Sequence, residues 1–102
     1  MLTTAREPVS AGEILVNEFM KPMNLTQGAL AEAMGVPRKH VNKLCNGRRA
    51  ATAATALILA RVFGNSAEFW LNVQRRGDVW KALHSPRERE RIERARPLER
   101  VG

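Results

Sequence analysis

The side chains best suited to chemistry form a basic, amide-bearing group in the first half of the chain. Four of them are spaced at i, i+1, i+4 and i+5, so a helix would carry them on one side: Arg38, Lys39, Asn42 and Lys43. Arginine and lysine donate hydrogen bonds to O6 and N7 of guanine, and asparagine pairs with N6 and N7 of adenine. These residue types at this spacing predict a helix that reads bases in the major groove of double-stranded DNA.

The charged residues in and around this helix are all basic. The stretch from Val36 to Arg49 holds five of the 17 basic residues and none of the ten acidic residues of a chain whose net charge is +7. Arg48 and Arg49 follow the helix in a loop, and Gln27 begins the preceding helix, at positions from which side chains can bind DNA phosphates. A basic helix face can also be simply solvated, and Gln27 can be an ordinary first-turn residue. The exclusion of acids favours a DNA-binding surface.

Presenting this surface to DNA requires two short helices held at a fixed angle. Thr26 is a typical N-cap for the first helix, Gly35 is typical of its end, and Pro37 suits the first turn of the second. Asn46-Gly47 would stop the second helix. Small and aliphatic residues would pack the two helices inward: Leu30, Ala31, Met34, Val36, Val41 and Leu44. This pattern predicts a helix-turn-helix.

Three further helices are predicted around this motif, and no segment alternates in the manner of a β-strand. The first begins at the capping box Ser10–Glu13 and ends near Pro22, the second covers residues 52–63, and the third runs from Ser66 to His84. We therefore expect an all-α bundle of five helices over residues 10–84, after an N-terminal arm at residues 1–9. Residues 85–102 form a charged C-terminal extension, either a solvated helix that ends at Pro97 or a frayed tail.

Composition excludes several other classes of function. One cysteine rules out an internal disulfide framework, and two distant histidines leave little for a metal site, so no metal or cofactor is expected. One aspartate, no Ser/His/Asp set and no phosphate-cradling glycine loop argue against an enzyme. No apolar run is long enough for a membrane span, and residues 1–10 lack the features of a secretory signal. The free cysteine fits the reducing cytoplasm.

A few residues that could carry chemistry are better interpreted as structural. We expect Cys45 and the three methionines Met20, Met23 and Met34 to pack in the core. His40 is expected at the surface or rim, and His84 at a helix end.

The last predicted helix carries more apolar bulk than a domain of this size needs. Its large residues either complete the core of the protomer or meet a second subunit: Phe69, Trp70, Val73, Trp80 and Leu83. A small helix-turn-helix domain makes few base contacts, and such domains commonly dimerise on two half-sites. We therefore expect a homodimer whose interface lies on this helix.

Several stretches resemble the HigA-type (VapI-like) antitoxins, which belong to the Xre/Cro helix-turn-helix class. The resemblance covers about residues 8 to 83 and is carried by these segments: Pro8–Leu15, Leu25–Gly47, Thr55–Leu57, Leu59–Arg61, Phe63–Gly64, Glu68–Asn72 and Gln74. The run Glu68-Phe-Trp-Leu-Asn72 with Gln74 is far more specific than the helix-turn-helix, which many repressor families share.

This resemblance implies a lambda-repressor-like fold and a bacterial, cytoplasmic homodimer that binds an operator in its own promoter, hence at the nucleoid. It also implies a toxin partner, a small HigB-like mRNA endonuclease encoded by an adjacent gene, which the antitoxin silences. The resemblance places the family's phosphate contacts on Gln27, Arg48 and Arg49. It places the family's base-recognition positions on the start and outer face of the second motif helix: Pro37, Arg38, Lys39, Asn42 and Lys43. The alternative is a stand-alone Xre-family transcriptional regulator without a toxin.

Two positions depart from the family pattern. Ala51 stands where the family has a larger aliphatic residue, and Ala54 where it often has an acid. We expect these departures to loosen the loop before the fourth helix and to weaken its phosphate contacts. The charged extension is longer than a minimal member needs and could add a toxin or DNA contact.

Overall fold

Helices account for all the regular structure in the segment that the computed structural model describes, residues 6–98. In chain order they are α1 (Ala11–Ile14), η1 (Leu15–Met20), α2 (Gln27–Met34), α3 (Arg38–Cys45), α4 (Ala53–Phe63), α5 (Ala67–His84) and α6 (Pro86–Arg94). The all-α prediction is confirmed. The predicted count of five is too low, because part of the charged extension forms α6, which ends at Arg94 rather than at Pro97.

Side-chain hydroxyls cap the start of α1, α2, α4, α5 and α6. Each cap hydroxyl accepts a hydrogen bond from the backbone N–H three residues ahead, at 3.1 to 3.4 Å, and five residues do so: Ser10, Thr26, Thr52, Ser66 and Ser85. At the other ends of α2 and α4, Gly35 and Gly64 adopt left-handed φ angles of 69° and 72°. Local interactions therefore set most helix boundaries.

The first predicted helix is α-helical in its first part, α1, and π-helical in its second part, η1. η1 is a π-helical segment in which N–H groups bond to carbonyls five residues earlier, as the N–H of Lys21 does to the Val16 carbonyl at 2.9 Å. Residues five apart then approach the same face, so Leu15 and Met20 are both buried. Met23 lies in the turn beyond η1 and is 60% exposed, so its predicted place in the core is wrong.

One core joins the helix-turn-helix to its neighbours. The largest fully buried side chains come from η1, α2, α3, α4 and α5: Leu15, Leu30, Val41, Leu44, Leu59 and Trp70. The indole N–H of Trp70 donates to Asn65 Oδ1 at 3.0 Å, and its ring centroid lies 5.1 Å from that of Phe19. This core holds α2 and α3 against η1, α4 and the start of α5.

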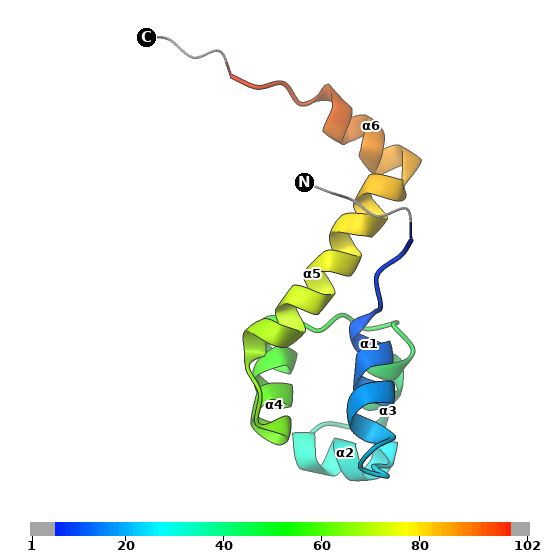
Figure 1. Ribbon diagram of the computed structural model, residues 1–102, viewed down its shortest axis with the longest axis vertical. Coiled ribbons are helices and arrows are strands. Elements are labelled where there is room, and N and C mark those ends of the chain that lie inside the picture. The colour runs from blue at the N-terminus through cyan, green and yellow to red at the C-terminus, as the bar shows by residue number, and fades with distance from the viewer. Residues whose placement is uncertain (1–5, 99–102) are drawn as a thin grey trace.

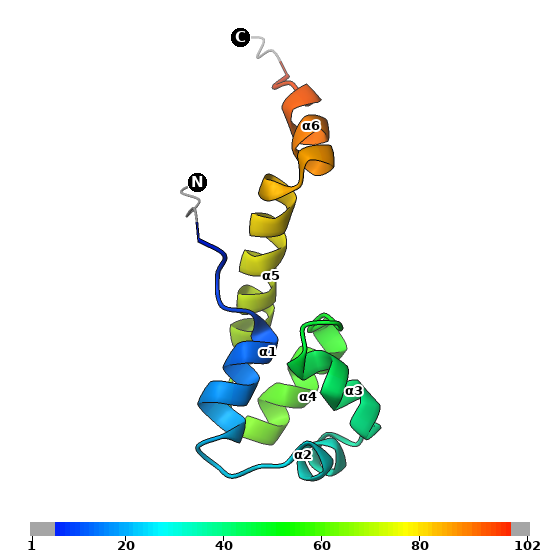
Figure 2. The same cartoon turned by 90° about the vertical axis from the view of Figure 1, so that its right-hand side faces the viewer.

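The molecule consists of a globular body and a projection. Figure 1 shows α1 to α4 and the first turns of α5 forming the body, while the remainder of α5 carries α6 away from it. The radius of gyration is 16.9 Å, above the roughly 13 Å expected for a compact domain of 100 residues, and the extents are 56 × 29 × 22 Å. Figure 2 shows that α3 lies on the body and α6 at the far end of the long axis.

Candidate nucleic-acid interface

The turn between α2 and α3 fixes the orientation of α3. Gly35 takes the left-handed conformation that ends α2, and the N–H of Val36 donates to the Ala31 carbonyl at 3.0 Å. Val41 and Leu44, on the inner side of α3, are 0% and 2% exposed. Their burial holds α3 on the body, so its opposite face is available to a ligand, as the helix-turn-helix prediction required.

The outer face of α3 brings together the predicted recognition residues. All of them are exposed: Pro37, Arg38, Lys39, Asn42 and Lys43. Arg48 and Arg49 are also exposed in the loop that leads from α3 to α4, and they extend the basic surface beyond the helix. None of these five cations forms an ion pair with a carboxylate among residues 6–98. Their positive charge is therefore free to meet DNA phosphates and base edges.

Side-chain amides link the start of α2 to this face. Asn42 Nδ2 donates to Gln27 Oε1 at 3.2 Å, and Asn46 Nδ2 donates to Asn42 Oδ1 at 3.1 Å. The half-buried Gln27 therefore lies beside α3, as its predicted role requires. The bonds also orient the Asn42 amide before any ligand arrives. The sequence analysis treated Asn46 only as a helix stop and missed its hydrogen bond to Asn42.

Two ionisable residues of α3 lie at the edge of the core. Burial lowers the pKa of the His40 imidazole below its usual value, and the guanidinium of Arg49 lowers it further. His40 Nε2 is buried and has no hydrogen-bond partner among the described residues. Burial raises the pKa of the Cys45 thiol, whose Sγ lies 3.8 Å from Met20 Sδ. Cys45 thus packs against the core, as predicted, and is not activated as a nucleophile.

The loop that carries Arg48 and Arg49 is tied to α5. The backbone N–H of Ala51 donates to Gln74 Oε1 at 2.8 Å, and Gln74 Nε2 donates to Asp78 Oδ1 at 3.0 Å. Ala51 itself is only 2% exposed. The sequence pointed to Gln74 only as part of the family motif and assigned it no role.

The apolar residues of α5 divide into two groups. Trp70 and Val73 are 0% and 5% exposed, so they complete the core of the protomer, which is the first of the two roles considered for them. Phe69 is 37% exposed beside the aromatic cluster of the body. Trp80 and Leu83 are half-buried on the projecting part of α5, where the Trp80 ring stacks on His84 at 4.0 Å. The structure therefore does not gather the five predicted interface residues on one exposed face.

Residues 6–98 contain no group of three or more His, Cys, Asp or Glu side chains that could hold a metal ion. Nor does this part of the chain contain a helix that is both long and apolar enough to cross a membrane.

Known proteins resemble this chain in sequence and fold. A family model described as helix-turn-helix matches residues 16–70. Antitoxin HigA-1 of Vibrio cholerae is 52% identical over 80 residues, which cover 78% of this chain and 75% of that protein.

Two antitoxins whose structures were solved with DNA also resemble this chain. The Pseudomonas aeruginosa antitoxin HigA with the higBA promoter matches with a TM-score of 0.80 and 32% identity, covering 90% of this chain and 99% of that one. The antitoxin GraA in complex with its operator matches with a TM-score of 0.83 and 33% identity, covering 98% and 100%.

Proposed function

Because this chain belongs to the HigA antitoxins of the helix-turn-helix family, we propose that it binds operator DNA and represses its own operon. The observation that carries this proposal is the exposed basic surface of α3 and the following loop, which contains no acid, on a helix that the buried Val41 and Leu44 hold against the core. Family members solved with operator or promoter DNA support it.

In this function α3 enters the major groove. The side chains at Arg38, Lys39, Asn42 and Lys43 contact base edges, with Pro37 at the start of the helix. Gln27, Arg48 and Arg49 bind phosphates and set the register of the protein on the duplex. The bound protein represses transcription because it occludes the promoter.

The second part of the proposed function is neutralisation of a toxin. The named relative from Vibrio cholerae is an antitoxin, and the corresponding partner here is a small HigB-like mRNA endonuclease encoded by an adjacent gene. The alternative is a stand-alone Xre-family regulator, which has the same DNA-binding surface and no toxin.

A homodimer would place two copies of α3 on two half-sites. We assign its interface to apolar side chains of α5 that the protomer leaves accessible, namely Phe69, Trp80 and Leu83. Such a dimer acts in the bacterial cytoplasm and joins the nucleoid when it binds DNA.

Binding to the protein's own promoter tests the DNA-binding proposal. Fluorescence anisotropy should show at least a thousandfold preference for a duplex from the region upstream of the gene over a scrambled duplex, at a stated salt concentration. Equal affinity for both duplexes would contradict sequence-specific repression.

A growth test separates the antitoxin from the stand-alone regulator. Expression of the adjacent small reading frame alone should stop growth, and co-expression of this protein should restore it. A harmless neighbour, or the absence of one, would favour the stand-alone regulator.

A further inference from the structure

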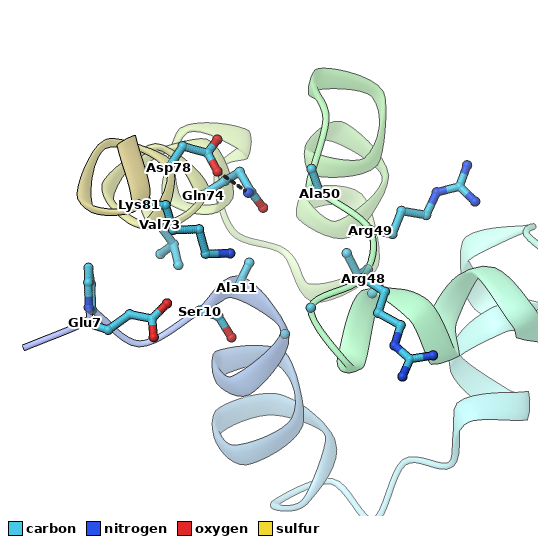
Figure 3. A pocket seen from close by; sticks show the side chains of 15 residues that line it. Glu7, Ser10, Ala11, Arg48, Arg49, Ala50, Val73, Gln74, Asp78 and Lys81 are labelled. Atoms are coloured by element: carbon cyan, nitrogen blue, oxygen red, sulfur yellow. Dashed lines mark hydrogen bonds between the residues drawn. The ribbon is translucent and has the colours of Figure 1, made fainter. Parts of the chain in front are cut away.

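The loop after α3 carries two of the proposed phosphate-binding residues but has little packing behind it. Residues 47–50 are exposed, and a pocket of about 220 Å³ separates the loop from α5 and from the N-terminal segment. In Figure 3, Gln74 and Asp78 lie on one side of this pocket, and Ala50 lies on the other. The side chains of Arg48 and Arg49 point away from α5.

Ala51 is the point at which this loop is attached. Its side chain is buried in a small cluster with Ala11 and Val73, and its N–H donates to Gln74 Oε1 at 2.8 Å. We expected the small Ala51 to loosen the loop, but the residue is 2% exposed and bonded to a side chain 23 positions away. The hydrogen bond therefore adds a polar attachment to this small apolar one.

The Gln74 amide is oriented for this task. Its Nε2 donates to Asp78 Oδ1 at 3.0 Å, one helical turn further along α5, which leaves Oε1 to face the loop. Loss of the acceptor would leave the buried N–H of Ala51 without a partner, which is more costly than never burying that group.

We propose that Gln74 is a positioning residue for DNA binding, because it holds the loop in the place from which Arg48 and Arg49 reach phosphates. This inference rests on the proposed DNA-binding function. Gln74 itself touches no DNA in this role and acts only through the loop.

Gln74→Met is the direct test, because methionine has a similar length and no acceptor of comparable strength. Affinity for the promoter duplex and for a scrambled duplex should fall by the same factor, about tenfold, since phosphate contacts carry no sequence information. The slope of log affinity against log salt concentration should become less negative by about one to two, the change expected when one or two phosphate contacts are lost. Amide hydrogen exchange at Ala51 should accelerate.

A paired substitution provides the rescue. Gln74→Glu with Asp78→Asn keeps the net charge, retains a carboxylate acceptor for the Ala51 N–H and lets the new amide donate to that carboxylate. This double variant should recover wild-type affinity and salt dependence. The single variant Gln74→Glu should not reach wild-type affinity, because its carboxylate would face the carboxylate of Asp78.

A double-mutant cycle decides whether Gln74 acts through the loop. In a background that carries Arg48→Ala and Arg49→Ala, Gln74→Met should cause no further loss of affinity. A tenfold loss in that background, or a wild-type salt dependence in the single variant, would overturn the inference. If the wild-type protein binds no DNA, the proposed function fails instead, while Ala51 exchange still reports whether Gln74 holds the loop.

Discussion

Arg38 and Arg49 lie on the same basic surface and are expected to act differently. Arg38 is exposed on α3, where a side chain can reach base edges. Arg38→Ala should cost about 1–3 kcal/mol on the promoter duplex and relax specificity at one base pair. Competition with single-base-pair variants of the duplex measures this. An equal loss on every sequence would show that Arg38 binds a phosphate.

Arg49→Ala should weaken binding to all DNA alike and reduce the salt slope by about one, because the loop lies beside the helix rather than on its reading face. Arg87→Ala is the matched control, since it makes the same change in charge on exposed α6, far from α3. An unchanged slope for Arg49→Ala, or an equal change for Arg87→Ala, would contradict a local phosphate contact.

His40 should make stability depend on pH. Its pKa in the folded protein lies below the ordinary value of about 6.5, because of burial and then of Arg49. The unfolded chain therefore binds the proton more strongly, so the unfolding free energy should decrease as pH falls below about 6.5 towards the folded pKa. Urea titrations at several pH values measure this, and His40→Gln should remove that part of the slope. An identical pH dependence in both proteins would show that His40 does not contribute.

At the scale of elements, the approach of α1 to α3 depends on one glycine. A Cβ at Gly12 would lie 2.4 Å from the Leu44 carbonyl oxygen and 2.7 Å from that of Cys45, and both are backbone atoms. Gly12→Ala should therefore push the two helices apart and destabilise the protein by about 1–3 kcal/mol. Thermal unfolding followed by circular dichroism measures the change.

Gly28→Ala is the matched control for this prediction. Gly28 lies in the first turn of α2, and a Cβ there meets nothing within 4 Å. Because alanine favours a helix, this variant should be as stable as the wild type or more stable by up to about 1 kcal/mol. If both variants lose the same stability, the close approach of α1 to α3 is not the cause.

At the scale of the whole molecule, α6 should add little to the stability of the protomer. It contains no buried residue, and its three ion pairs are exposed pairs within one helix, such as Arg91–Glu88 at 3.1 Å. Such pairs contribute roughly 0.3–0.5 kcal/mol each. A chain that ends at His84 should therefore unfold within a few degrees of the full chain. A large fall in melting temperature that depends on protein concentration would place α6 in the dimer interface.

The sequence by itself determined most helix boundaries, the helix-turn-helix and its basic face. Caps, terminal glycines and side-chain spacing act within about four residues, so hydroxyls such as Ser66 and the run from Arg38 to Lys43 identify these features without tertiary information. The helix of the charged extension was left as one of two alternatives, although Ser85 caps it through a bond just as local.

Only the tertiary structure decided which side chains meet across long separations. The assignment of Trp70 to the core and the bond between Ala51 and Gln74 both depend on residues that no local period relates. Packing between distant segments selects among such contacts, because each becomes favourable only after the other helices have placed its partners. For that reason the exposed basic surface of α3 could be predicted from the sequence, whereas the contact between Ala51 and Gln74 could not.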